Sequence, residues 1–90
     1  MTNRHGIAAR DMYNAMAGEL VESARENAKL TQTELARRLG MTQPALSRKL
    51  SGARGWDIGE LIEVASVLDV PITDLIPERR VGTSVRSLTQ

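Results

Sequence analysis

The feature that most constrains the fold is a pair of short segments that follow each other closely, each with its own helix start and stop signals. Thr31 is followed three residues later by Glu34, and this Thr-x-x-Glu pattern is a capping box that starts a helix. Gly40 ends that helix, because glycine adopts the left-handed conformation without a steric penalty. Thr42 is a second N-cap, and Gly52 closes the segment after it. The sequence therefore predicts two short helices joined by a tight turn.

The remaining apolar residues predict further helices. Tyr13 and Trp56 are the only aromatic residues, although 41% of the chain is hydrophobic. The core must therefore consist of Leu, Ile, Val, Ala and Met, which suits packed helices better than a sheet. Helical spacing predicts a first helix over about 13–28, a fourth that starts at Asp57, and a short fifth over 71–76. The fourth helix is expected to bury four apolar residues: Leu61, Ile62, Ala65 and Leu68.

These elements fit a single domain. A chain of 90 residues has room for one small core. We expect an all-α domain of five helices over residues 13–77. Residues 1–12 show no strong periodicity and are expected to be a flexible lead-in. Residues 78–90, which are rich in Ser, Thr and Arg, are expected to be a flexible basic tail.

Charge is distributed unevenly along the chain. Residues 29–56 contain six Lys or Arg and one Glu, whereas residues 57–77 contain five Asp or Glu and neither Lys nor Arg. A basic block next to an acidic block predicts one positively charged face, which is the usual footprint of a protein that binds a polyanion. Charge alone leaves a second interpretation open, in which these residues only solvate helix surfaces.

Several function classes are disfavoured by what the sequence lacks. It has no Cys, a single His and no Gly-rich phosphate loop, so we expect neither catalysis nor a metal or cofactor site. No apolar run approaches the roughly 20 residues that span a bilayer, and residues 1–10 lack the apolar centre of a signal peptide. The expectation is a cytoplasmic, non-enzymatic protein with no membrane partner.

The two short helices suggest a nucleic-acid function. Two short helices with a glycine-containing turn form the helix-turn-helix arrangement, in which the second helix enters the major groove of DNA. In this chain the second helix offers Gln43, which can pair with adenine, and Arg48, which can pair with guanine. For Arg48 a phosphate clamp is the alternative interpretation.

The run from Leu30 to Arg48, LTQTELARRLGMTQPALSR, resembles the helix-turn-helix of the Cro and phage-repressor type, also called the XRE type. The family pattern is Leu, Ser or Thr, Gln, any residue, Glu-Leu-Ala, then Leu-Gly at the turn and a helix that opens with Ser or Thr. Residues 60–75 are similar to the family's fourth and fifth helices, so the resemblance covers roughly Leu20–Ile76. It implies a five-helix, lambda-repressor-like domain in which the second and third helices form the helix-turn-helix.

The resemblance also implies roles for individual residues. The helix from about Gln43 to Leu50 would lie in the major groove, with Gln32 bracing Gln43. Base contacts are implied for Gln43, Pro44, Ser47 and Arg48. Phosphate contacts are implied for Gln32, Thr42, Lys49, Arg54 and, through backbone N–H groups near it, Gly52.

One departure from the family affects the end of this helix. Many members have an apolar residue followed by Glu where this chain has Lys49-Leu50, and that Glu pairs with an arginine of the first helix. Arg25 stands at the arginine's position and loses this partner. The alternatives are that it pairs with Glu22 or Glu26, or reaches DNA. The change also predicts that Leu50, rather than residue 49, points inward.

The resemblance implies a sequence-specific transcriptional regulator of duplex DNA, expected to be a repressor of phage-related type, associated with the nucleoid of a bacterial or phage-infected cell. One module covers little DNA, so we expect a homodimer on two half-sites. The dimer surface is expected near the end of the fourth helix and the fifth: Val70, Ile72, Leu75 and Ile76. The alternative is an antitoxin or adaptor of the same fold that contacts a partner protein through the tail.

Overall fold

The computed structural model of the chain describes residues 2–78, with side chains from residue 9 onward. The described residues are helical and contain no strand, and none of their helices is long and apolar enough to cross a membrane. Within residues 2–78, four α-helices precede a short 3₁₀ helix: α1 (Thr2–Asn27), α2 (Gln32–Leu39), α3 (Gln43–Ser51), α4 (Ile58–Leu68) and η1 (Ile72–Leu75). The all-α prediction is confirmed, but a 3₁₀ helix of 4 residues replaces the last predicted helix.

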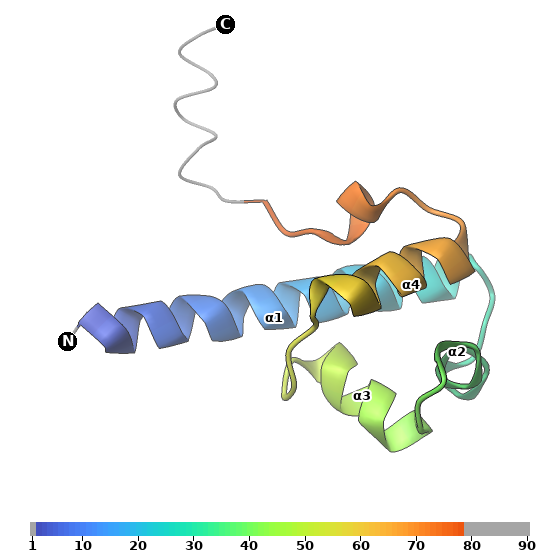
Figure 1. Cartoon of the computed structure of the whole chain (residues 1–90), viewed down its shortest axis with the longest axis horizontal. Helices are drawn as coiled ribbons and strands as arrows, with labels where there is room; N and C mark the ends of the chain where they lie inside the picture. The colour runs from blue at the N-terminus through green and yellow to red at the C-terminus, as the bar shows by residue number, and fades with distance from the viewer. Residues whose placement is uncertain (1, 79–90) are drawn as a thin grey trace, which may run out of the picture.

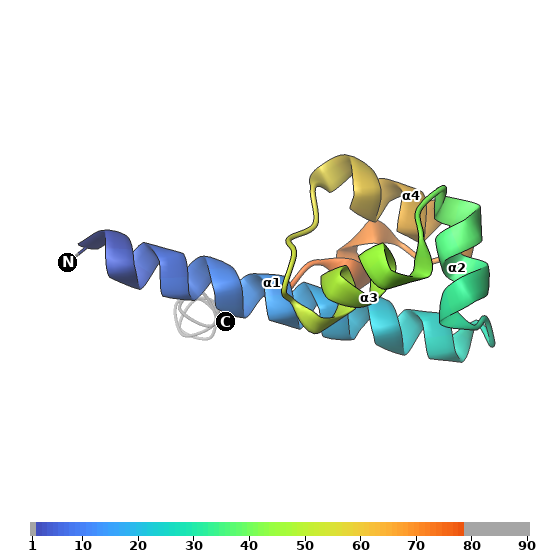
Figure 2. The ribbon, with the colours of Figure 1, turned by 90° about the horizontal axis from the view of Figure 1, so that it is seen from below.

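The elements pack on one end of α1 (Figure 1). α3 and α4 both contact α1, and η1 packs between α4 and α1. α2 contacts α3 and α4 near the C-terminal end of α1. Figure 2 shows that the N-terminal part of α1 extends beyond the other helices. The second half of α1 is therefore the platform that holds α3 in place.

α1 begins much earlier than the sequence pattern predicted. The expected start was near Tyr13, whereas the helix starts at Thr2, so residues 2–12 are its first turns rather than a separate lead-in. Hydrophobic periodicity detects a helix only where one face is buried, and among the α1 side chains described, from residue 9 onward, the first buried one is Ala17. Good helix formers such as Ala9 and Met12 extend a helix without a buried face. The predicted tail, apart from Glu78, lies outside the described residues.

The predicted caps of α2 and α3 are confirmed. Thr31 Oγ1 accepts from Glu34 N at 3.1 Å, and Glu34 Oε1 accepts from Thr31 N at 2.8 Å. Gly40 ends α2 in the left-handed region, with φ of 72°. Thr42 Oγ1 accepts from Ala45 N at 3.3 Å and starts α3. These bonds satisfy backbone groups that the helix ends leave open, so α2 and α3 begin and end where the sequence predicts.

The core gathers residues from every element. Its fully buried large side chains are Val21, Leu35, Leu46, Val64 and Leu75. The buried stripe of α4 differs from the prediction, because Ile62 is 54% exposed and Val64 takes its place. The observed stripe of residues 61, 64, 65 and 68 has the i, i+3, i+4, i+7 spacing of one helix face, which residue 62 does not share.

A close crossing of α1 and α3 is set by Gly18. A Cβ atom at Gly18 would lie 2.3 Å from the carbonyl oxygen of Leu50 and 2.9 Å from that of Lys49. These are backbone atoms near the end of α3, which cannot move without moving that helix. The backbones of α1 and α3 therefore approach each other directly, without side chains between them.

Candidate nucleic-acid interface

Beside its buried face, α3 carries a stripe of four residues, of which all but Pro44 are polar. Leu46 and Leu50 are buried and hold the helix on the core. The four residues predicted to contact bases form the stripe: Gln43, Pro44 and Arg48 are exposed, and Ser47 is half-buried. They form two pairs four residues apart, and residues at this spacing are neighbours on a helix surface. We call these four residues the α3 stripe.

The N-terminal end of α3 suits an anion. Thr42 is exposed and caps the helix, and the first turn contains no acidic residue. Pro44 also lies in this turn, where its missing N–H removes no helical hydrogen bond. Helix N-termini carry a partial positive charge and bind phosphate groups. The phosphate contact predicted for Thr42 therefore fits this geometry and remains a prediction.

A chain of side-chain hydrogen bonds links α1, α2 and α3 at the start of the α3 stripe. Gln43 Nε2 donates to Gln32 Oε1 at 3.0 Å. Gln32 Nε2 in turn donates to Glu22 Oε2 at 3.4 Å. The bracing contact that the family resemblance implies between Gln32 and Gln43 is therefore present. Gln43 is exposed, and the hydrogen bond to Gln32 holds its side-chain amide on the side that faces α2.

Arg25 pairs with Glu22, since position 50 is Leu and not the glutamate that many family members have there. Its Nε donates to Glu22 Oε1 at 2.8 Å, and its Nη2 donates to Glu22 Oε2 at 2.7 Å. Nη1 donates to the carbonyl of Leu30, and Glu26 Oε2 lies 3.8 Å from Nη2. Of the alternatives, pairing with Glu22 is confirmed. Three Arg25 N–H groups donate within the domain and only 14% of the side chain is exposed, which leaves little of the guanidinium for DNA.

The Glu22–Arg25 pair predicts a pH dependence of stability. The hydrogen bond from Arg25 lowers the pKa of Glu22 below its ordinary value of 4.5, despite some desolvation. A carboxylate whose pKa is lower in the folded state stabilises the fold above its unfolded pKa, and this contribution is lost as the pH falls through the folded pKa. We expect melting temperature to fall more steeply for the wild type than for Glu22→Gln below about pH 4.5.

The measurement is a series of thermal melts followed by circular dichroism, from neutral pH to about pH 3. Glu26→Gln is the matched control, because the Glu26 carboxylate is 65% exposed and lies 3.8 Å from Arg25. Its profile should follow that of the wild type. Parallel profiles for the wild type and Glu22→Gln would contradict the prediction.

Lys49 occupies an internal clamp, contrary to the predicted phosphate contact. Its Nζ lies 2.9 Å from Glu60 Oε1, donates to the Gly55 carbonyl at 3.0 Å and sits 5.6 Å from the centre of the Trp56 ring. The Trp56 Nε1–H donates to the Lys49 carbonyl at 3.1 Å. Only 14% of the Lys49 side chain is exposed. Lys49 therefore fastens the loop after α3 to the start of α4.

The backbone near Gly52 is also engaged within the chain, contrary to the predicted phosphate contact there. Gly52 ends α3 with φ of 88°, and its N–H donates to the Lys49 carbonyl at 3.2 Å. The N–H groups of Ala53 and Arg54 likewise donate to acceptors in α3. The side chain of Arg54 is exposed. Of the two contacts predicted in this loop, Arg54 therefore remains a candidate and the Gly52 backbone does not.

The predicted dimer residues do not share one exposed surface. Leu75 is fully buried in the core, so its predicted role at a dimer surface is wrong. Val70 and Ile72 are half-buried and pack against the core. Ile76 is 41% exposed. The 3₁₀ helix turns Leu75 inward because the chain folds back over α4 and α1 at this point.

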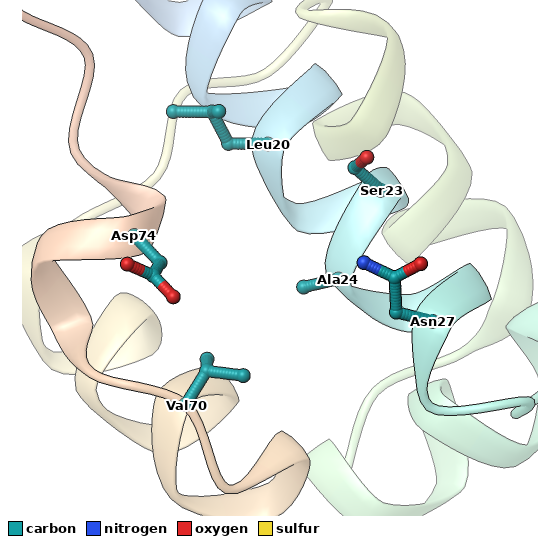
Figure 3. Close-up of a pocket in the computed structure, with 6 residues that line it drawn as sticks. All are labelled: Leu20, Ser23, Ala24, Asn27, Val70 and Asp74. Carbon is teal, nitrogen blue, oxygen red and sulfur yellow. The ribbon is translucent and has the colours of Figure 1, made fainter.

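A shallow hollow lies between α1 and the segment around η1 (Figure 3). Its volume is about 220 Å³, and it is lined by Leu20, Ser23, Ala24, Asn27, Val70 and Asp74. Asp74 is the single titratable residue of this lining. The described residues contain no group of three or more His, Cys, Asp or Glu that could hold a metal ion.

Two features of α4 have no counterpart in the predictions from sequence. Ile58 is 63% exposed, one turn from Ile62. Its position outside the buried stripe of the helix is a signal in the sequence, because exposed apolar residues are candidates for contact with another molecule. Glu60 is the partner of Lys49, and residue spacing gives no signal for this pair because a loop separates the two helices.

Comparison with known proteins places most of the described helices in a known family. A helix-turn-helix family profile matches residues 21–75. The chain is also 36% identical, over 61 residues, to the uncharacterized HTH-type transcriptional regulator YqaE of Bacillus subtilis (strain 168). That alignment covers 68% of this chain and 53% of the relative. This chain therefore spans about half the length of that curated protein.

Two solved structures share the arrangement of helices. Crystal structures of HppE, one of the Co(II) form in complex with substrate and one of the Fe(II) form, each superpose with a TM-score of 0.66 at 27% identity. The match covers 72% of this chain, but 36% of the first HppE chain and 35% of the second. The similarity is thus confined to about a third of those proteins.

Proposed function

Because the chain belongs to the helix-turn-helix family of the Cro and phage-repressor (XRE) type, we propose that it binds duplex DNA sequence-specifically and regulates transcription. α2 and α3 form the helix-turn-helix of a lambda-repressor-like domain, and α3 lies in the major groove from about Gln43 to Leu50. The observation that carries this proposal is the α3 stripe. Apart from Pro44 its residues are polar, apart from Ser47 they are exposed, and buried Leu46 and Leu50 anchor the same helix on the core.

The regulatory role is proposed to be repression, as in the phage repressors that the sequence resembles. A protein that occupies a promoter needs no further domain to block it. The described domain supplies a positioned base-contacting helix, and the exposed Arg54 supplies a phosphate contact beside it. Phosphate contacts position such a protein, and base contacts give it specificity. Its place of action is then the DNA of the cytoplasm.

The proposed function is binding without catalysis. The domain shares its helices with part of HppE, but about two-thirds of each HppE chain has no counterpart here. A fold shared between proteins does not carry an activity with it, since activity belongs to particular sites. The α3 stripe offers amide and guanidinium groups that suit base edges and includes no nucleophile paired with a base.

The protein is proposed to act as a homodimer on two half-sites about 34–36 Å apart. With Leu75 buried, exposed Ile76 and the half-buried Val70 and Ile72 are the part of the predicted surface that a second copy could contact. Sedimentation with and without a duplex carrying two half-sites tests this directly. A single copy per duplex at saturating protein would exclude the dimer and leave DNA binding intact.

Selection from a pool of random duplexes tests the proposed function. The protein should enrich a defined motif at a stated salt concentration, because affinity for DNA depends strongly on salt. A variant in which Gln43 and Arg48 are both alanine is the control and should enrich no motif. Failure of the wild type to enrich any sequence would refute sequence-specific binding.

A protein-interaction role is the second candidate, favoured by the exposed Ile58 and Ile62 on α4. The C-terminal tail, on which the antitoxin interpretation first rested, lies outside the described residues. An adaptor of this kind would bind duplexes weakly or without dependence on salt, because it would neutralise few phosphates. The selection experiment above therefore separates the DNA-binding regulator from such an adaptor. An antitoxin would still bind DNA, so co-purification with a partner protein is the test for that role.

Arg54 and Lys49 should respond differently to substitution. Arg54→Ala removes an exposed cation and should lower the slope of log affinity against log salt by about 1 unit for duplexes of any sequence. Lys49→Met keeps the aliphatic stem but breaks the clamp to Glu60 and Gly55. It should lower stability by about 1 kcal/mol and leave the salt slope unchanged. Salt titrations and thermal melts of both variants check this, and a full unit of slope lost in Lys49→Met would restore its phosphate contact.

A further inference from the structure

We propose that Glu22, which lies on α1 and outside the helix-turn-helix, determines the base preference of Gln43 by fixing the orientation of its side-chain amide. This inference rests on the proposed DNA-binding function and makes it more specific. The chain of hydrogen bonds from Arg25 through Glu22 and Gln32 to Gln43 has a direction, and that direction decides which atoms Gln43 presents to a base.

The direction starts at Arg25, because a guanidinium group can only donate. It donates to both oxygens of Glu22, at 2.8 Å and 2.7 Å. The Glu22 carboxylate is ionised and can only accept, and the hydrogen bond from Arg25 keeps its pKa low. Any further group that contacts Glu22 must therefore donate to it.

Gln32 is the group that contacts Glu22, and its amide has two ends of opposite character. Its Nε2 lies 3.4 Å from Glu22 Oε2, and its Oε1 accepts from Gln43. A flipped Gln32 amide would place its oxygen against the carboxylate, so that two acceptors would face each other. Glu22 therefore keeps the oxygen of Gln32 turned toward α3.

Gln43 is oriented by the same logic. Its Nε2 must face Gln32 Oε1, at 3.0 Å, which uses one of the two amide hydrogens. The groups left for DNA are one N–H donor and the Oε1 acceptor. Adenine presents a matching N7 acceptor and N6 donor in the major groove, whereas guanine presents two acceptors, N7 and O6. The oriented amide thus selects adenine and cannot donate to both acceptors of guanine.

Glu22→Gln is the informative substitution because it can reverse the chain. The new amide NH2 group would take the place of Oε2, to which both Gln32 Nε2 and Arg25 Nη2 donate. Arg25 would keep its bond from Nε to the remaining oxygen, its Nη2 would move away, and Gln32 would flip. Gln43 would then turn its oxygen toward Gln32 and present two N–H donors, the pattern that suits guanine. The change retains the length of the side chain and an acceptor for Arg25.

The experiment compares affinities for duplexes that differ at one base pair, the pair at which Gln43→Ala abolishes preference. The wild type should favour adenine over guanine by about 10-fold, within the range of about 5- to 150-fold for one bidentate contact. In Glu22→Gln the ratio should fall to about 1 or favour guanine. The proposal would be overturned if Glu22→Gln kept an adenine preference within twofold of the wild-type value. It would also be overturned if the wild type did not favour adenine.

Three further variants separate orientation from a general loss of structure. Gln32→Ala leaves the Glu22–Arg25 pair intact and should also weaken the adenine preference. Glu26→Gln alters the other carboxylate near Arg25, which contacts no glutamine, and should leave the preference unchanged. In a Gln43→Ala background, Glu22→Gln should have no further effect on base preference, as a double-mutant cycle requires of residues that act through one another.

The outcomes also distinguish this proposal from the proposed function. If the wild type binds no duplex specifically, both the proposed function and the orienting role of Glu22 are refuted. If specific binding depends on Gln43 but does not change when Glu22 or Gln32 is substituted, the orienting role alone is refuted. All variants are compared at a temperature at which circular dichroism shows them folded, and the nitrogen-bound side-chain protons of Gln43 in the free protein should shift in the NMR spectrum of Glu22→Gln.

Discussion

Gly18→Ala should lower the stability of the domain by about 3 kcal/mol, which corresponds to a fall in melting temperature of roughly 12–24 °C. The added Cβ would lie 2.3 Å from the Leu50 carbonyl oxygen and 2.8 Å from the carbonyl carbon. Both atoms belong to the backbone, so the contact can be relieved only by separating α1 from α3. Such a separation would loosen Leu46 and Leu50, which anchor α3 on the core.

Gly59→Ala is the matched control for this substitution. Gly59 also lies within a helix, and its added Cβ would meet only Asp57 Oδ1, at 3.4 Å, which is an ordinary contact. In the middle of a helix, alanine is favoured over glycine by roughly 0.5–1 kcal/mol, and Gly59 lies in the first turn of α4, where the gain is at most of this size. Gly59→Ala should therefore melt at or above the wild-type temperature. Thermal melts measure both variants. If their melting temperatures differed by only a few degrees, α1 and α3 would not cross as closely as described.

The parts of the fold that the sequence predicted are those that local hydrogen bonds determine. The start of α2 depends on Thr31 and Glu34, and its end depends on Gly40, all of which act within a few residues. The same holds for Thr42 at the start of α3. Because these signals need no knowledge of the rest of the molecule, the boundaries of α2 and α3 agree with the prediction.

The predictions that were wrong concern residues whose positions depend on contacts between distant segments. The inward turn of Leu75 follows from how the chain returns over α4 and α1, which no local pattern specifies. Lys49 looked available because its partner, Glu60, lies on another helix beyond a loop. Ile62 was assigned to the core because it is apolar, although the spacing of its neighbours already placed it on another face. The α3 stripe was found from sequence because the capped helix fixed its register, whereas its brace through Glu22 required the packing of three helices.

Arg48→Ala should weaken binding to the preferred DNA site by about 1–3 kcal/mol and abolish preference at a single base pair. Arg48 is exposed within the α3 stripe, and no salt bridge to it is present among the side chains described, those of residues 9–78. A guanidinium that is not committed within the fold can donate two parallel hydrogen bonds to N7 and O6 of guanine. Alanine at an exposed helix position disturbs the fold little, so the loss should appear in DNA binding rather than in stability.

Competition titrations at fixed salt, with each base pair of the selected site replaced in turn, measure this effect. Arg37→Ala is the matched control, because it removes the same charge from an exposed position of α2 and should leave the base preferences unchanged. If Arg48 instead clamped a phosphate, its loss would weaken all duplexes equally and lower the salt slope by about 1 unit. That outcome would show that Arg48 does not recognise guanine. It would also require a different register of α3 in the groove. Gln43 and Arg48 lie on one rigid helix, so their base contacts must shift together.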